Sequence, residues 1–319
     1  MAPYAQPRLG RSLLDLATSV VPYVALTAAG YLLRDVSYLL VLALAVPTAG
    51  FLLRTYMLFH DCTHGSLMPS KRANTWLGVA LGLVVFSPFA SWKHDHAVHH
   101  ATNGDLDRRG VGDVLTLTVA EYHALPWRKR LGYRLFRNPL VMFAFGPLWV
   151  ILIGPRLFSR SMRPRIRRSI IATDVALVAL VGSLCVLVGW QDYLLVQGPP
   201  ILLASSAGIW LFYVQHQFED AYWEDSGRWS YADAALRGSS YLVLPKALQF
   251  FSGNIGLHHV HHLSARIPNY NLQSAHDDNP IFHDVPTISL ADGIRAVRLK
   301  LWDEEQRRLV TWSEARRRA

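Results

Sequence analysis

Cysteine and the common redox-cofactor motifs are almost absent from this chain. Its two cysteines, Cys62 and Cys185, are too few and too far apart for a disulfide framework or a set of iron–sulfur ligands. The sequence also has no G-x-G-x-x-G nucleotide fingerprint after a strand and no C-x-x-C-H haem attachment motif. Any redox chemistry of this protein therefore needs electrons from an external donor.

Charged residues are also scarce, at 17% of the sequence against 51% apolar residues. The charges are grouped between long uncharged runs, which excludes an ordinary soluble domain and is typical of an integral membrane protein. The net charge of +9 comes from basic residues beside apolar runs, a pattern that the positive-inside rule explains better than nucleic-acid binding. No convincing small-residue cleavage site follows Arg8 and Arg11, so we expect a first membrane span rather than a signal peptide.

Four membrane-spanning helices are expected from the apolar runs, since a span needs about 20 such residues. They are predicted at about 14–34, 36–56, 170–190 and 193–215. Basic segments flank them at Arg8 and Arg11, at 127–137, at 163–168 and in a basic C-terminal tail, 301–319. The positive-inside rule places these segments, and with them both termini, in the cytoplasm.

Two further apolar runs, 73–92 and 138–155, are expected to be interfacial or re-entrant. Run 138–155 has basic residues on both sides and is interrupted by Gly146-Pro147, so it cannot cross once if both flanks are cytoplasmic. Run 73–92 separates two histidine motifs that must lie on one side of the membrane if they share a site. No repeat or linker divides the chain, and residues 1–319 are predicted to form a single domain.

Histidine, in contrast, is plentiful. The chain has 14 histidines, and most of them lie in "HDCTH" (60–64), "HDHAVHH" (94–100) and "HHVHH" (258–262). In a helix, residues at i, i+3 and i+4 share one face. The sets with this spacing are His60 and His64; His96, His99 and His100; and His258, His261 and His262. Three helical faces of convergent imidazoles are what a multinuclear metal site requires.

The number of imidazoles indicates more than one metal. A single tetrahedral zinc uses three or four protein ligands, whereas the three motifs supply eight. Two irons are the natural assignment for oxygen chemistry, although neutral imidazole also suits zinc, copper and nickel. The alternatives are a loose metal trap and a non-catalytic membrane metal-binding or transport protein. A transporter would place its polar ligands near the bilayer midplane, whereas these motifs adjoin the ends of apolar runs.

The fold class expected is an all-α integral membrane protein. About four transmembrane helices and the interfacial or re-entrant helices carry a cytoplasmic His-rich cap, 60–135 and 216–300, which holds a di-metal centre. Because His60 follows Arg54 by six residues, about 9 Å along a helix, the metals are expected just outside the bilayer.

The three motifs resemble the histidine boxes of the membrane fatty acid desaturase superfamily in order and approximate spacing. The similarity runs from about residue 35 to 285. The stretches "FHDCTHGS", "SWKHDHAVHH", "VQHQFEDAYW" and "GLHHVHHLSARIPNYNL" are similar to the omega branch, the Δ12- and ω3-type acyl desaturases, and its bacterial relatives. The resemblance implies a di-iron centre, dioxygen, two external electrons and a long acyl chain as substrate.

The resemblance also implies a ligand set. It consists of His60, His64, His96, His99, His100, His216, His258, His261 and His262. His216 matches a lone histidine of the family at the end of a late span. Some members have an asparagine one helical turn earlier that holds a metal-bound water, but this chain has Phe212 there, which leaves the second iron's coordination open. His94 and His259 match no family ligand. No metal role is expected for His123, His276 or His283.

Several neighbours of the boxes are candidates for supporting roles. Asp61, and in the same way Asp95, Glu219 and Asp220, are candidates to orient a ligating imidazole by a hydrogen bond, with a plain solvated acid as the alternative. Apolar residues beside the boxes are candidates for lining an acyl tunnel, with ordinary packing as the alternative. They are Leu58, Phe59, Leu257 and Val260.

The function expected is an oxygen-dependent acyl desaturase of a bacterial inner membrane, with its histidine boxes in the cytoplasm. An unactivated C–H bond is too strong for acid–base groups, so the metal must carry the chemistry. A ferredoxin or cytochrome b5-like protein is the expected electron donor, and Arg165, Arg167 and Arg168 are candidates for docking it. The substrate carrier stays open between glycerolipid, coenzyme A and acyl carrier protein. The alternative is a hydroxylase, ketolase or acetylenase with the same di-iron site.

Overall fold

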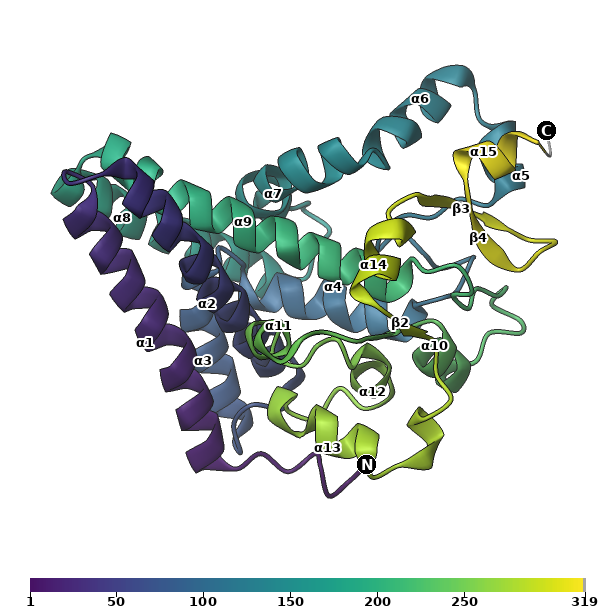
Figure 1. Ribbon diagram of the computed structural model, residues 1–319, viewed down its shortest axis with the longest axis horizontal. Helices are drawn as coiled ribbons and strands as arrows, with labels where there is room; N and C mark the ends of the chain where they lie inside the picture. The colour runs from purple at the N-terminus through teal and green to yellow at the C-terminus, as the bar shows by residue number, and fades with distance from the viewer. Residues whose placement is uncertain (318–319) are drawn as a thin grey trace.

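Four long apolar helices form the frame of the protein (Figure 1). They are α1 (Leu9–Leu33), α2 (Tyr38–His64), α8 (Pro164–Val188) and α9 (Trp190–His216). Each is long and apolar enough to cross a membrane, and the expected number of about four spans is confirmed. The computed structural model describes residues 1–317, so the end of the predicted basic tail, 318–319, lies outside the described residues.

The four helices form two antiparallel pairs. Only residues 34–37 join α1 to α2, and Gly189, with φ of 88°, joins α8 to α9. The start of α1 therefore lies beside the end of α2, where Ser12 Oγ donates to the Leu67 carbonyl at 2.5 Å. α2 packs against both α1 and α9, which places it at the centre of the frame.

The helix α2 continues beyond residue 56, where the predicted membrane span ends. It runs to His64 and stops at Gly65, whose left-handed φ of 71° suits glycine. The first histidine motif therefore lies on the last turns of a spanning helix. α8 begins earlier than predicted, at Pro164, because proline is favourable in the first turn of a helix.

Two bent helix pairs replace the predicted apolar elements 73–92 and 138–155. α3 (Lys71–Val84) meets α4 (Phe89–Thr102) at a bend of 102°, and α6 (Trp127–Phe136) meets the segment Val141–Arg156 at 61°. That segment comprises the irregular turns η1 (Val141–Phe145), η2 (Trp149–Ile153) and η3 (Gly154–Arg156) around α7 (Gly146–Leu148). At the first bend Phe86 has a φ of 58°. Bends of this size belong to a broken span or a re-entrant loop, and the membrane placement of both runs stays a prediction.

Short elements between α9 and the C-terminal hairpin cover one end of the frame (Figure 1). Most are one or two helical turns, and β1 pairs with β2 in parallel. They are α10 (Tyr231–Arg237), β1 (Tyr241–Leu242), α11 (Lys246–Phe251), α12 (His258–Leu263), η4 (Asn269–Asn271), α13 (Leu272–Asp277), η5 (Pro280–Phe282), β2 (Thr287–Ile288) and α14 (Leu290–Ala296).

The predicted basic tail is folded over most of its length. β3 (Leu299–Asp303) and β4 (Arg308–Thr311) form an antiparallel hairpin, followed by α15 (Trp312–Arg316). The hairpin is ordered because Leu301 and Val310 are almost fully buried, in a cluster with Tyr122 of α5 (Val119–Ala124) and Tyr133 of α6. The two small sheets are the only strands among residues 1–317, and the fold is otherwise helical, as expected.

Candidate metal centre

The first pair of histidines projects from the last two turns of α2. His60 and His64 are one turn apart and therefore share a face, with ring centroids 4.7 Å apart. The backbone N–H of Gly65 donates to the carbonyls of Asp61 and Cys62, which satisfies the end of the helix. The pair is thus carried by a well-closed helix terminus.

The other two motifs lie on α4 and α12, and each is divided between two groups of histidines. In both motifs the residues at i and i+4 join one group and the residue at i+3 joins the other. The first group is His60, His64, His96, His100 and His261, and the second is His99, His216, His258 and His262. The structure thus brings together all nine histidines that the sequence singled out, in a division that their spacing did not predict.

In the first group the Nε2 atoms face one another. His96 Nε2 lies 2.9 Å from His60 Nε2 and 3.1 Å from His100 Nε2, which is 3.0 Å from His261 Nε2. Nε2 of His64 is buried without a hydrogen-bond partner among the described residues. A neutral imidazole carries one N–H, so a ring of lone pairs and single protons cannot satisfy five converging nitrogens. A shared cation can.

In the second group the Nε2 atoms also face one another, and the tautomer of His216 is fixed. His216 Nε2 lies 2.9 Å from His258 Nε2 and 3.1 Å from His99 Nε2, and His262 Nε2 is 3.1 Å from His258 Nε2. His216 Nδ1 donates to the Gly238 carbonyl at 3.0 Å. This bond leaves Nε2 of His216 as the free lone pair, in the way that backbone carbonyls orient metal-bound histidines.

The spacing of the nitrogens fits metal ions with more than four ligands. Metal–nitrogen bonds of about 2.1 Å at right angles put neighbouring donors about 3.0 Å apart, whereas a tetrahedron puts them about 3.4 Å apart. The contacts between donors in both groups are 2.9 to 3.1 Å. The residues present therefore suit two metals that prefer five or six ligands better than tetrahedral zinc.

The histidines of α12 are held in the form that binds metals. Burial, together with the neighbouring imidazoles, lowers the pKa of His258, His261 and His262 well below the ordinary value. They are therefore neutral at physiological pH, and no proton has to leave before a metal binds.

Two aromatic rings shield the groups from water. The Trp92 ring lies 4.3 Å from that of His96 and 5.6 Å from that of His60. The Phe212 ring lies 5.0 Å from His99 and closes the second group from the α9 side. At the position where some family members have an asparagine, the second group thus meets an apolar ring, and it has four imidazoles where the first has five.

Asp61 connects the first group to a buried ionic network. Its Oδ1 lies 3.4 Å from His60 Nδ1, longer than an ordinary hydrogen bond, so the contact is electrostatic. Its Oδ2 accepts from the backbone N–H and the side-chain Nδ2 of Asn269, at 2.8 and 3.0 Å. The Asn269 amide also donates to Asp15, at 2.8 Å, and Asp15 pairs with Arg54. Sequence analysis missed Asp15 and Arg54, although charged residues inside apolar spans mark such networks.

The other predicted orienting carboxylates lie at the surface. Asp95 is exposed, and the Glu219 side chain, 58% exposed, pairs with Arg308 of β4. That ion pair accounts for Glu219 without any histidine, and the orienting role of both residues stays a prediction.

The histidines not assigned as ligands lie outside the two groups. His94 is exposed, and the buried His259 places Nε2 3.0 Å from Nδ1 of His276. The candidate tunnel residues Leu58, Phe59, Leu257 and Val260 are all buried, in two apolar clusters beside the boxes.

Comparison with known proteins identifies the family. Residues 36–287 match the family model described as fatty acid desaturase. The chain is 47% identical over 312 residues to a fatty acid desaturase of Bacillus subtilis (strain 168), which covers 98% of this chain and 89% of that protein.

Two relatives from Synechocystis sp. are more distant. An sn-1 acyl-lipid omega-3 desaturase (ferredoxin) is 27% identical over 238 residues, 69% of this chain and 62% of that protein. An sn-1 oleoyl-lipid 12-desaturase is 26% identical over 224 residues, 69% of this chain and 63% of that protein. This chain thus spans less than two thirds of the length of either relative.

Two expectations are confirmed by these matches. All the relatives described are desaturases, which favours acyl desaturation over the hydroxylase, ketolase and acetylenase alternatives. The four candidate membrane helices and the two histidine groups that could hold metal ions are what this family leads one to expect. The chain belongs to the fatty acid desaturase family, whose members are membrane oxidoreductases.

Proposed function

We propose that this desaturase holds two iron ions, one in each histidine group, and uses dioxygen to introduce a double bond into a long acyl chain. The convergence of nine imidazole nitrogens into two groups with contacts near 3 Å supports this most directly. When bound, the iron pair supplies the oxidising power to remove two hydrogens from an unactivated chain, which acid–base groups cannot do.

The chain itself holds and orients the histidine nitrogens and shields them from water. The i and i+4 pairs of α2, α4 and α12 present Nε2 atoms from rigid helix faces, and Gly238 fixes the His216 tautomer. Trp92 and Phe212 keep water from the histidine rings. Apolar residues beside the boxes, such as Leu257, direct the substrate chain towards the two groups.

Electrons come from an external ferredoxin or cytochrome b5-like protein, since the sequence carries no other redox-cofactor motif. The three arginines at the start of α8, Arg165, Arg167 and Arg168, are the docking site that we propose for it. The positive-inside rule accounts for basic residues at this end of α8, and the same cluster is complementary in charge to an acidic donor protein. α8 packs against α4, where Ser169 Oγ accepts from the Ala90 N–H at 3.1 Å, so the arginines lie close to the helix that carries the second box.

We place the histidine groups and both termini on the cytoplasmic side of a bacterial inner membrane. The basic start of α8 and the arginines at the start of α1 support this orientation through the positive-inside rule.

The function is tested by expressing the full chain in a host that makes only saturated and monounsaturated lipids. Mass spectrometry that locates double bonds should find new unsaturation, with none in cells that carry His258→Ala. A matched control is His94→Ala, an exposed histidine outside both groups, which should keep the activity. An oxygenated product in place of a new double bond would contradict desaturation, and a purified active chain without iron would contradict the metal assignment.

A further inference from the structure

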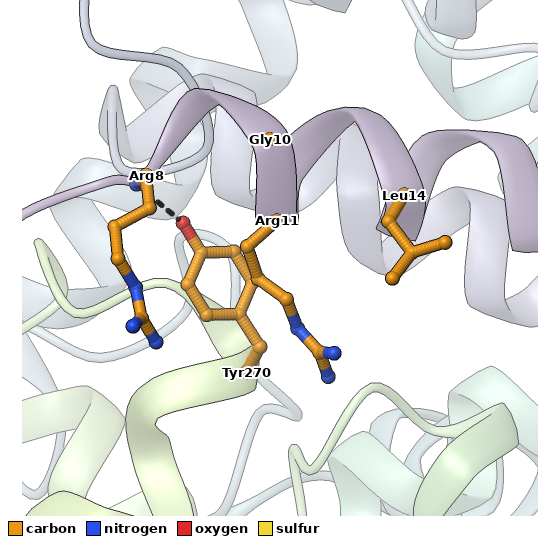
Figure 2. A pocket seen from close by; sticks show the side chains of 5 residues that line it. All are labelled: Arg8, Gly10, Arg11, Leu14 and Tyr270. Carbon is orange, nitrogen blue, oxygen red and sulfur yellow. Dashed lines mark hydrogen bonds between the residues drawn. The ribbon is translucent and has the colours of Figure 1, made fainter.

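A basic pocket lies at the start of α1, apart from the histidine groups (Figure 2). Its volume is about 550 Å³, and it is lined by Arg8, Gly10, Arg11, Leu14 and Tyr270. The phenol of Tyr270 anchors it, because the hydroxyl accepts from the Arg8 backbone N–H at 3.0 Å and lies 3.1 Å from Ser12 Oγ. These bonds tie the loop after the third histidine box to the first turn of a spanning helix.

The pocket carries two positive charges without carboxylate partners. Arg8 and Arg11 are exposed, and among residues 1–317 neither forms a salt bridge. The Arg11 guanidinium lies 5.8 Å from the centre of the Tyr270 ring, and Figure 2 shows the two guanidinium groups on either side of that ring. Asp15, one turn beyond Arg11, is already paired with Arg54. Two free guanidinium groups facing one pocket match the oxygens of a phosphate.

The apolar side of the pocket indicates which kind of phosphate compound binds. Leu14 lines the pocket and is 52% exposed, and Leu13 and Val21 continue an exposed apolar face along α1. A ligand that contacts both parts has its phosphate directly beside an apolar body, as a glycerophospholipid does. In an acyl-coenzyme A, by contrast, the pantetheine arm separates the phosphates from the acyl chain.

The pocket is also connected to the metal centre. Asn269, which precedes Tyr270, donates to Asp61, and Asp61 follows the ligand His60 on α2. Ser12, one turn into α1, bonds to the Leu67 carbonyl just beyond the end of α2. A group held at this pocket therefore has a fixed position relative to the first histidine group.

We propose that Arg8 and Arg11, held in place by Tyr270, bind the phosphodiester of a membrane glycerophospholipid whose acyl chain the enzyme desaturates. This inference rests on the proposed desaturation and adds the carrier of the substrate. The headgroup binds at the membrane surface between the two arginines, and the acyl chains remain on the apolar face of α1.

Binding is tested with the full-length protein purified in detergent. Dioleoyl-phosphatidylglycerol is titrated against it while the midpoint of thermal unfolding is followed, with dioleoylglycerol, coenzyme A and inorganic phosphate as separate probes. Phosphatidylglycerol should raise the midpoint of the wild type and not that of R8Q/R11Q, and dioleoylglycerol should raise neither. The matched control is R128Q/K129Q, which removes two exposed basic residues beside another aromatic ring and should respond as the wild type does.

Either of two results overturns the proposal. If phosphatidylglycerol raises the unfolding midpoint of R8Q/R11Q as much as that of the wild type, the two arginines do not form the site. Stabilisation of the wild type by coenzyme A or inorganic phosphate, but not by phosphatidylglycerol, removes the lipid assignment.

Kinetics separate this site from the desaturation itself. Basic residues near anionic lipid each strengthen binding about fivefold, so R8Q/R11Q should raise the KM for a phospholipid substrate about tenfold or more. R8K/R11K should recover part of that loss, and both variants should keep the iron content and the unfolding midpoint of the lipid-free wild type. An iron-loaded R8Q/R11Q enzyme with the wild-type KM for the phospholipid would contradict the headgroup site but not the proposed desaturation. A wild-type chain that binds no iron and forms no double bond contradicts the proposed function.

Discussion

Removal of single histidines tests the division of each motif between two metals. His99 belongs to the second group, whereas its neighbour in the same motif, His96, belongs to the first. His99→Ala leaves three of four imidazoles in its group, and His96→Ala leaves four of five. We therefore expect His99→Ala to lower the iron content from about two ions per chain to about one, and His96→Ala to lower it less.

The assay is the iron content of the purified chain by mass spectrometry, normalised to protein. His99→Ala combined with His216→Ala, within one group, should lose little more iron than His99→Ala alone, because the second loss falls on a site already emptied. His99→Ala combined with His96→Ala should lose more, since both groups are then damaged. His259→Ala changes a buried histidine outside both groups and should keep full iron. The division is refuted if the cross-group double variant keeps as much iron as His99→Ala alone.

Three further perturbations have outcomes that follow from the structure. Arg54→Met leaves Asp15 buried without its cation and should lower the free energy of unfolding in mixed micelles by about 3–5 kcal/mol. The control Arg34→Met removes a partly exposed ion pair and should lower it by less than about 1 kcal/mol. Equal losses of stability in the two variants would contradict the buried network. Burial, with the charge of Arg137, lowers the pKa of Lys300 to about 7. Because the unfolded chain then binds this proton more readily than the folded chain, the free energy of unfolding should rise by about 2 kcal/mol from pH 7 to pH 9. This rise should be absent in Lys300→Met. A rise that persists in Lys300→Met would refute its assignment to Lys300. Reversal of the three arginines that begin α8 to glutamate should raise the KM for the reduced donor without changing single-turnover rates after chemical reduction, and unchanged donor kinetics would exclude this docking site.

The sequence predicted which histidines converge better than it predicted their arrangement. Spacing at i, i+3 and i+4 shows which histidines share a helix face, and all nine converge. Which face meets which depends on how α4 and α12 pack across the end of α2, and no local pattern encodes that. The division of His96 and His99 between two groups therefore emerges only in three dimensions.

A buried charge lets α2 continue past the predicted end of its membrane span. Arg54 interrupts the apolar run and ended the predicted span near residue 56. In the structure Arg54 is buried and neutralised by Asp15 of α1, so the helix continues to His64. A partner 39 residues away in sequence cannot be found by a local count of charges.

The C-terminal hairpin was not expected from the sequence. Its many arginines dominate the composition and predicted a tail. The buried positions that hold it, Leu301, Leu309 and Val310, are few and lie on two short strands. The partners of Leu301 and Val310 on α5 and α6, and those of Leu309 at 218–223, are distant in sequence, so the apolar signal is weak until the fold is known.

The histidine motifs on α4 and α12 each contribute to both groups, which makes the geometry of the two groups interdependent. α12 gives His261 to one group and His258 and His262 to the other, and α4 does the reverse. A rotation of α12 about its own axis would draw one set of nitrogens inward while carrying the other set away. Tyr270 lies eight residues beyond His262 in the chain, so a movement of that loop that turned α12 would affect both histidine groups, in opposite directions. A rotation of α12 alone would therefore change the geometry of both histidine groups together.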